Sequence, residues 1–264
     1  MPVLIYVKRT SMAGENKKIL NHLLQTWPFG VVAVSPWLKA QGAYQQLMHE
    51  YEKSGWVRKI GRGAYARAGD RVDWRGGLYA LQQQMRLPVH VADKSALQLT
   101  GYAHFLPLGN DGMLSLFGPP GVRLSSWFLK HDWGLRLRYT TSDLFKNMSE
   151  AGLTTKQYET FSITLSAPER AMMELLHLVP HDEPYEEAAL LMEGLATLRP
   201  NLVQGLLESC RSIKVKRLFL HLAEECNHDW VDMLNTAKIN LGQGKRMIVK
   251  GGRLDTRYNI TVPG

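Results

Sequence analysis

Residues 35–67 constrain the fold of this chain most, because two helical patterns and a hairpin follow one another there with glycine at each turn. The first pattern begins with Ser35, the expected N-cap of a short helix, and has Pro36 in the position where a first helical turn best tolerates proline. It ends at Gly42. A short helix, a glycine turn and a second helix are the order of a helix-turn-helix, whose second helix enters the major groove of DNA.

The second helix of this pair, residues 43–54, is expected to present amide and basic side chains to solvent. Its apolar face is formed by Tyr44, Leu47, Met48 and Tyr51, and Gly55 ends the helix. Because glutamine can pair bidentately with adenine, Gln45 and Gln46 are the candidate base readers. His49 and Lys53 are candidates for phosphate contact, and Tyr44 joins this set at the start of the helix.

A basic hairpin follows the second helix. Residues 57–67 alternate apolar and charged side chains and turn through Gly61, Arg62 and Gly63. The candidate DNA-contacting side chains of this hairpin are Arg58, Lys59, Arg62 and Arg67. A further helical pattern over residues 11–27 is expected to be a scaffold helix. Together the three helices and the hairpin predict a winged helix-turn-helix over residues 12–69 that binds duplex DNA. Two alternatives remain open, since charged hairpins are often only solvated and winged helices also dock proteins.

The basic charge of the chain lies at its two ends. The net charge is +8, and residues 1–70 carry 10 Lys/Arg against 4 Asp/Glu, while residues 241–264 carry 5 against 1. The middle of the chain is therefore slightly acidic. The C-terminal cations, which are further DNA-contact candidates, are Lys245, Arg246, Lys250, Arg253 and Arg257. We expect two strands here, joined as a hairpin at Gly251 and Gly252. Positive ends on a near-neutral body favour a polyanionic partner.

The remaining residues predict a mixed α/β domain. Strand patterns near residues 87–91, 113–117, 135–141 and 161–165 alternate with helical patterns near residues 74–85, 94–104, 184–197, 200–211 and 214–226. Ser166 and Glu169 of the SAPERAMMELL segment have the spacing of a capping box at a helix start. The predicted fold is α+β, with an N-terminal winged helix-turn-helix over residues 1–70 and a larger mixed α/β domain with a basic C-terminal β-hairpin over residues 71–264.

Motifs for catalysis and cofactor binding are missing from the sequence. The FGPPG turn lacks the lysine and the helix entry of a phosphate-binding loop, and the histidines near Cys226 do not have zinc-ligand spacing. We therefore predict no enzyme activity, no metal and no cofactor. Cys210 and Cys226 are expected to be free thiols. No apolar run approaches the roughly 20 residues of a membrane span, and the start of the chain lacks the charge order of a secretory signal, so we expect a cytoplasmic protein.

The chain resembles the AbiEi family. Four segments carry the resemblance: the predicted DNA-binding region at the N-terminus, the SAPERAMMELL segment, the IKVKRLFLHLAEE helix and the basic tail VKGGRLDTRYNITVP. These proteins are antitoxin-type transcriptional regulators of type IV (abortive-infection) toxin-antitoxin systems. The resemblance implies an N-terminal winged helix that represses its own operon at inverted repeats, with residues 43–54 as recognition helix and residues 57–67 as wing. It also implies DNA contact by the basic tail, a C-terminal domain required for antitoxin activity, and a nucleotidyltransferase-like toxin as partner.

Three other functions remain open from the residues themselves. The chain could be a nucleic-acid-processing enzyme with the basic tail as substrate groove, a regulator without antitoxin activity, or a protein-interaction module. Nothing in the sequence is typical of a coiled coil, so we expect a monomer in solution that pairs on DNA half-sites.

Overall fold

The computed structural model describes residues 3–102, 112–146 and 150–263, with side chains described for residue 14 and from residue 16 onward. These residues form two compact units. The N-terminal unit comprises residues 1–88, 123–134 and 157–163, and the C-terminal unit comprises residues 89–122, 135–156 and 164–264. The N-terminal unit thus extends beyond the expected limit at residue 70 and takes in two segments from much later in the chain.

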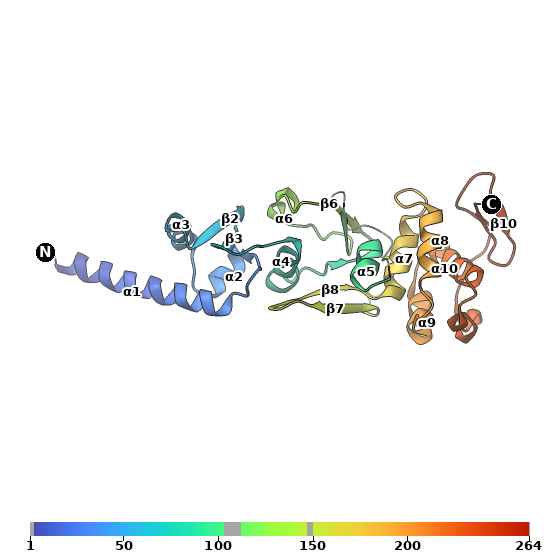
Figure 1. Cartoon of the computed structure of the whole chain (residues 1–264), viewed down its shortest axis with the longest axis horizontal. Helices are drawn as coiled ribbons and strands as arrows, with labels where there is room; N and C mark the ends of the chain where they lie inside the picture. The colour runs from blue at the N-terminus through green and yellow to red at the C-terminus, as the bar shows by residue number, and fades with distance from the viewer. Residues whose placement is uncertain (1–2, 103–111, 147–149, 264) are drawn as a thin grey trace. The chain divides into compact units, whose positions relative to one another are not determined.

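The N-terminal unit contains a winged helix-turn-helix (Figure 1). Its elements are α1 (Val3–Thr26), β1 (Ala33–Val34), α2 (Ser35–Ala40), α3 (Gln45–Lys53), β2 (Val57–Gly61) and β3 (Ala64–Arg67). The three strands form an antiparallel sheet in the order β1-β3-β2, in which Ala33 lies opposite Tyr65. The predicted order of helices and hairpin is confirmed, and α1 begins before the predicted position at residue 11.

The core of this unit is built where the sheet and the apolar helix faces meet. Leu47, Met48 and Tyr51 of α3 are buried, as are Leu23 and Trp27 at the end of α1 and just after it. The Tyr51 hydroxyl donates to the backbone carbonyl of Asn16 at 2.5 Å. Burial raises the pKa of Tyr51 to about 12, so the hydroxyl keeps its proton and remains a donor. These contacts fix α3 to α1 and leave its opposite face to solvent.

Three further helical segments support the winged helix. They are α4 (Trp74–Tyr79), η1 (Ala80–Gln84) and α6 (Ser126–Lys130). The Gln84 side chain accepts from the Val34 amide and donates to the Val32 carbonyl, both at 2.9 Å, and so bonds the strand edge that β3 does not cover. At Gly61 in β2, a side chain would lie only 2.7 Å from Cβ of Trp127, so glycine is needed for α6 to pack against the wing.

The C-terminal unit is built on a five-stranded mixed sheet in the order β6-β5-β4-β8-β7. The strands are β4 (His90–Val91), β5 (Met113–Gly118), β6 (Arg136–Thr141), β7 (Leu153–Gln157) and β8 (Ser162–Ser166). Strand β4 runs antiparallel to β5 and parallel to β8, and β5 runs parallel to β6. The larger mixed α/β domain and the α+β class are therefore confirmed, although β7 was not predicted.

Helix α7 lies at the centre of the helices in this unit. These helices are α5 (Asp93–Leu99), α7 (Pro168–Leu178), α8 (Tyr185–Glu193), α9 (Pro200–Ser209) and α10 (Ile213–Glu225). Helix α7 contacts the four others, and its residues are buried almost throughout. The helix predicted near residues 94–104 ends at Leu99, and the end of that predicted range, from residue 103, lies outside the described residues.

Two of the predicted helix caps are wrong. Helix α7 has Ala167 as its N-cap, and Ser166 donates instead to Glu174 at 2.6 Å, while Glu169 accepts from Arg199. Helix α2 has Val34 as its N-cap, and the Ser35 hydroxyl donates to the Gly63 carbonyl of the wing and not to an amide of the first helical turn. In each case a partner distant in the sequence has taken the side chain that local spacing assigned to the cap.

The predicted hairpin at Gly251 and Gly252 is also wrong. The tail strands are β9 (Arg246–Met247), β10 (Arg253–Asp255) and β11 (Ile260–Val262), and the sheet order is β10-β11-β9. Strand β11 lies between the other two, antiparallel to β10 and parallel to β9. A side chain at Gly252 would meet the Val262 carbonyl at 2.0 Å, so this glycine allows a close backbone approach and does not form a hairpin turn.

Candidate DNA interface

The turn between α2 and α3 fixes the position of the recognition helix. Gly42 has a φ of +86°, a conformation that favours glycine, and its amide donates to the Lys39 carbonyl at 3.0 Å. The amide of Ala43 donates to the Leu38 carbonyl at 2.9 Å, and Ala43 is itself buried. The chain therefore leaves α2 in one defined direction, and α3 starts from a fixed point.

The solvent face of α3 carries the side chains that could enter a groove. Gln46, His49 and Lys53 are three and four residues apart, so they lie along one face, opposite the buried Leu47 and Tyr51. All three are exposed. The arrangement offers an amide and two basic groups in a row, as direct reading of base edges with flanking phosphate contact requires.

A groove of about 460 Å³ lies between α2, the start of α3 and the wing. The polar side chains in its lining are Ser35, Lys39, Tyr44, Gln45, Lys59, Arg62 and Tyr65. Gln45 thus lies in this groove and not on the row formed by Gln46. Sequence reasoning missed Lys39, whose position in the last turn of the first helix of the motif was the available signal.

The wing is held against α2 by hydrogen bonds to one carbonyl. The backbone amide of Ser35 donates to the Gly63 carbonyl at 2.8 Å, and the Ser35 hydroxyl donates to the same oxygen at 3.2 Å. Arg62 lies at the turn between β2 and β3 and is exposed, as are Arg58 and Lys59 on β2. The predicted positions of these three cations on an exposed hairpin agree with the structure.

Arg67 does not lie on the exposed ribbon as predicted. Its side chain is only 8% exposed, and the guanidinium donates to the carbonyls of Trp27 and Leu24, the latter at 3.2 Å. It also lies 4.0 Å from the centre of the Phe29 ring and 3.8 Å from the Asp70 carboxylate. Arg67 therefore caps the C-terminal end of α1, where backbone carbonyls lack helical partners.

Replacing Arg67 by methionine is expected to lower the stability of the N-terminal unit by about 2–3 kcal/mol, because buried carbonyls at the end of α1 lose their donors. A thermal melt followed by circular dichroism measures this loss. The control is Lys59→Met, which changes an exposed cation on the same hairpin and should leave the melting temperature unchanged. An unchanged melt for Arg67→Met, with lost DNA binding, would instead restore Arg67 as a DNA contact.

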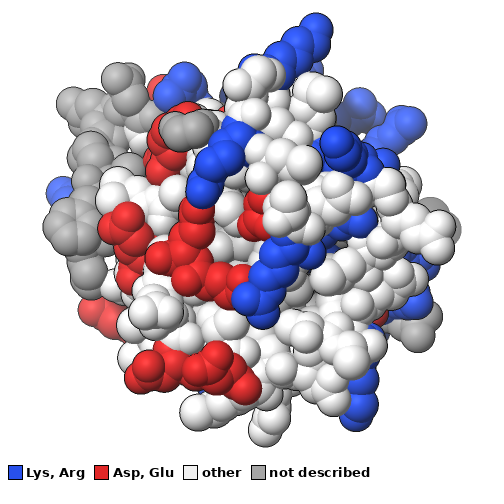
Figure 2. Space-filling model, turned by 90° about the vertical axis from the view of Figure 1, so that its right-hand side faces the viewer, with Lys and Arg blue, Asp and Glu red and all other residues white. Residues whose placement is uncertain are grey.

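The cations of the tail fall into two groups. Arg253 pairs with Glu225 at 2.7 Å, and Arg257 pairs with Glu224 at 2.9 Å, so their charge is largely matched by α10. Lys245, Arg246 and Lys250 are exposed and form no ion pair with another described residue. Figure 2 shows, on the face of the C-terminal unit that it displays, acidic side chains gathered beside the basic ones. The tail is therefore less uniformly positive than its sequence predicted.

Neither a metal centre nor a membrane helix is found in the described part of the chain. No group of three or more histidine, cysteine, aspartate or glutamate side chains between residues 14 and 263, the masked segments excepted, is placed to hold a metal ion. No described helix combines the length and the apolar character that crossing a bilayer requires. His221, one of the histidines weighed as a zinc ligand, instead contacts Asp255 through Nδ1 at 2.6 Å.

Comparisons with known proteins cover nearly the whole chain. A family described as "Transcriptional regulator, AbiEi antitoxin, Type IV TA system" matches residues 111–263. A family described as "Transcriptional regulator, AbiEi antitoxin N-terminal domain" matches residues 16–108. No curated protein matches the chain. The crystal structure of the RV2827C protein from Mycobacterium tuberculosis is similar with a TM-score of 0.61 and 15% identity, over 92% of this chain and 89% of that one. At this identity the likeness shows the fold alone.

Proposed function

Because the chain belongs to the AbiEi family of transcriptional regulators and antitoxins of type IV toxin-antitoxin systems, we propose that it binds duplex DNA upstream of its own operon and represses transcription. The observation that carries this proposal is the surface formed by α3, the groove and the wing. On it Gln46, His49 and Lys53 form an exposed row, and the groove beside them has cationic walls. No catalytic step, metal or cofactor is part of the proposal.

In this proposal α3 lies in the major groove. Gln45 and Gln46 read base edges, and the cations at the groove and the wing contact the phosphate backbone. Lys39 joins the wing cations Lys59 and Arg62 in this role. The operator is an inverted repeat, and one copy of the chain occupies each half-site. The protein is a monomer in solution and pairs on DNA.

The autorepressor proposal is tested by fluorescence anisotropy of the full chain with two duplexes. One carries the region upstream of its own reading frame, and the other carries the same bases in shuffled order. We expect at least about tenfold tighter binding to the first duplex, and log affinity should fall linearly with log salt concentration for both. Equal affinity for the two duplexes would contradict sequence-specific repression.

Substituting the two glutamines separates their roles. Gln46→Ala is expected to reduce the preference for the operator by about 1–3 kcal/mol, because a bidentate base contact is lost. Gln45→Ala should reduce it by the same mechanism if Gln45 reaches a base from the groove. The measurement is the ratio of affinities for the operator and the shuffled duplex at one salt concentration. A parallel loss on both duplexes would show that the residue contacts only the backbone.

The free cations of the tail are proposed to contact phosphate as well. Replacing Lys245, Arg246 and Lys250 together by glutamine should lower the slope of log affinity against log salt by about 2–3 and leave the operator preference intact. Substitution is a better test than deletion, because Ile260 and Val262 of the tail are fully buried and their loss would expose the core. An unchanged slope would confine DNA contact to the N-terminal unit.

We further propose that the chain counteracts a nucleotidyltransferase-like toxin encoded beside it. The support is family membership, since no residue of the C-terminal unit is identified as an antitoxin site. The test is growth of cells that express the neighbouring reading frame with and without this chain. Rescue of growth by the chain supports the proposal. A toxic neighbour that the chain does not rescue would leave a regulator without antitoxin activity.

A further inference from the structure

Arg217 of helix α10 is buried and bonds to the backbone of the basic tail. Its side chain belongs to a residue that is only 2% exposed. Nε donates to the Leu241 carbonyl at 2.8 Å, and Nη2 donates to the Gly242 carbonyl at 3.1 Å. Nη1 donates to the Gly244 carbonyl at 2.7 Å and to the Asn259 carbonyl at 3.0 Å. One guanidinium therefore bonds four carbonyls, three shortly before strand β9 and one directly before strand β11.

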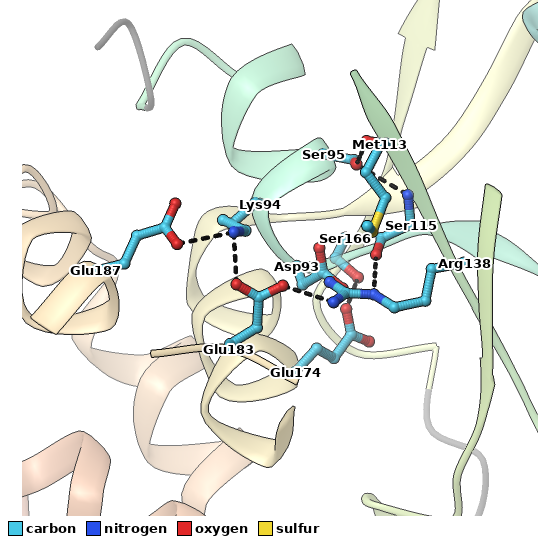
Figure 3. A network of polar contacts seen from close by, with 10 residues as sticks. All are labelled: Asp93, Lys94, Ser95, Met113, Ser115, Arg138, Ser166, Glu174, Glu183 and Glu187. Carbon is cyan, nitrogen blue, oxygen red and sulfur yellow. Dashed lines mark hydrogen bonds and ion pairs between the residues drawn. The ribbon is translucent and has the colours of Figure 1, made fainter. Parts of the chain in front are cut away.

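The charge of Arg217 is not matched by a carboxylate among the described residues. By contrast, Arg138 of the same unit donates to Asp93 at 3.1 Å and to Glu183 at 2.6 Å (Figure 3). Burial lowers the pKa of Arg217, and the like charge of the nearby Arg246 lowers it further. Positive charge without a described anionic partner thus gathers where α10 meets the tail.

The bonds of Arg217 fix the backbone around the tail cations Lys245 and Arg246. Gly244, one of the four acceptors, directly precedes Lys245. The Asn259 carbonyl accepts from Arg217 and also from the backbone amide of Arg246, at 3.0 Å in each case. Because a guanidinium is planar and donates in several fixed directions, a lysine ammonium cannot form the same set of bonds. Arg217 therefore determines where these two cations leave the backbone.

We propose that Arg217 is a positioning residue for DNA binding, which holds Lys245 and Arg246 in a preformed arrangement that receives a backbone phosphate. This inference rests on the proposed contact between the tail cations and DNA. Lys245 and Arg246 are exposed and available to a phosphate, whereas Arg217 is buried and acts only through the backbone that it bonds. A fixed pair of cations binds more tightly than a loose one, because less conformational entropy is lost on binding.

The variant that tests this role is Arg217→Lys, measured in the full chain by fluorescence anisotropy with the upstream duplex and the shuffled duplex. The net charge is unchanged, so the long-range attraction to DNA stays the same. We expect binding to both duplexes to weaken by about threefold to tenfold, with the operator preference intact, because the tail must then be ordered as it binds. Affinity equal to that of the unchanged chain would overturn the proposal.

The control for a merely structural effect is Arg138→Lys, which alters another multiply bonded arginine of the same unit. At a temperature at which circular dichroism shows both variants to be folded, Arg138→Lys should leave DNA affinity unchanged. Equal weakening by the two variants would overturn the proposal, because lost stability would then be the cause.

Hydrogen exchange of the unchanged chain without DNA gives a measurement that needs no variant. The amides of Arg246 and Ile248 donate to the carbonyls of Asn259 and Thr261, at 3.0 and 2.9 Å. In a preformed tail these two amides should exchange at least about tenfold more slowly than in an unstructured peptide. Exchange as fast as in such a peptide would contradict a prearranged site, even if Arg217→Lys failed to fold.

Combining Arg217→Lys with the replacement of Lys245, Arg246 and Lys250 by glutamine separates this role from the tail contact on which it rests. If the tail replacement alone does not weaken DNA binding, the proposed tail contact fails and the role of Arg217 fails with it. If the tail replacement weakens binding, we expect Arg217→Lys to cause no further loss in that background, because its effect passes through the tail cations. A further loss as large as in the unchanged chain would overturn the positioning role alone.

Discussion

Replacing Lys39, Lys59 and Arg62 together by glutamine is expected to weaken binding to every duplex about 100-fold. Each of these side chains lines the groove between α2, α3 and the wing, where it can reach a phosphate. A hydrogen bond of this kind contributes about 1 kcal/mol net, and three of them account for the expected loss. The slope of log affinity against log salt should also fall by about 2–3, because fewer counterions are released.

The control for this variant is the replacement of Lys17, Lys18 and Lys130 by glutamine. These exposed lysines belong to the same unit and do not line the groove, and their loss changes the net charge by the same amount. The control is expected to lose only the small long-range part of the attraction. If both variants bound equally weakly, net charge and not the groove would determine DNA binding.

Replacing Glu174 by alanine is expected to destabilise the C-terminal unit by about 3–5 kcal/mol. The Glu174 carboxylate is 1% exposed and lies 2.8 Å from His90, 2.8 Å from Arg170 and 2.6 Å from the Ser166 hydroxyl. Removing it leaves a buried histidine and a buried arginine without their shared anion. Chemical denaturation measures the loss, and Glu193→Ala, which alters an exposed glutamate on α8, should change the stability by less than about 0.5 kcal/mol.

Acid titration provides an independent check on the same residue. Burial works against the charged form of Glu174, but His90 and Arg170 outweigh it and lower the pKa of Glu174 to about 2 from its usual 4.5. The ionised carboxylate therefore contributes stability that is fully present above pH 4.5 and is lost as the pH falls through about 2. In Glu174→Gln this acid-dependent part, about 3 kcal/mol, should be missing. An identical pH profile for both proteins would contradict the assigned ion pairs.

The order of elements could be predicted wherever it depends on neighbouring residues. Gly42 and Gly55 take φ values of +86° and +74° and mark the two ends of the recognition helix, whose apolar spacing lies between them. Arg62 was placed correctly for the same reason, since the Gly-Arg-Gly turn puts it at the end of a hairpin. The recognition helix and the wing are local features, so the sequence predicts them without knowledge of the rest of the fold.

The features that sequence reasoning missed depend on partners far along the chain. Arg67 was predicted to face DNA, but it bonds to carbonyls about 40 residues earlier. Gly61 reads as a turn residue, yet it is also the point where Trp127 approaches the wing. Ser166 has the spacing of a helix cap, but it bonds to Glu174. A pattern of spacing describes one element, and it does not reveal which distant side chain competes for the same hydrogen bond.

The residues of the candidate DNA interface were predicted only in part, because some of them come together only in the folded chain. Gln46, His49 and Lys53 were predicted from helical spacing and do form one exposed face. Lys39 was missed because its relevance comes from the wing, which approaches it only in the folded chain. In the tail, strand β11 contributes two pairings that no local turn signal indicated.

Hydrogen exchange of the full chain, with and without a duplex from its own upstream region, tests most directly which surface binds DNA. The duplex is expected to slow exchange in α3 and in the turn between β2 and β3. Slower exchange at residues 245–250 would add the tail to the interface. Unchanged exchange throughout residues 35–67, while the duplex is bound, would show that DNA does not bind to α3, the groove and the wing.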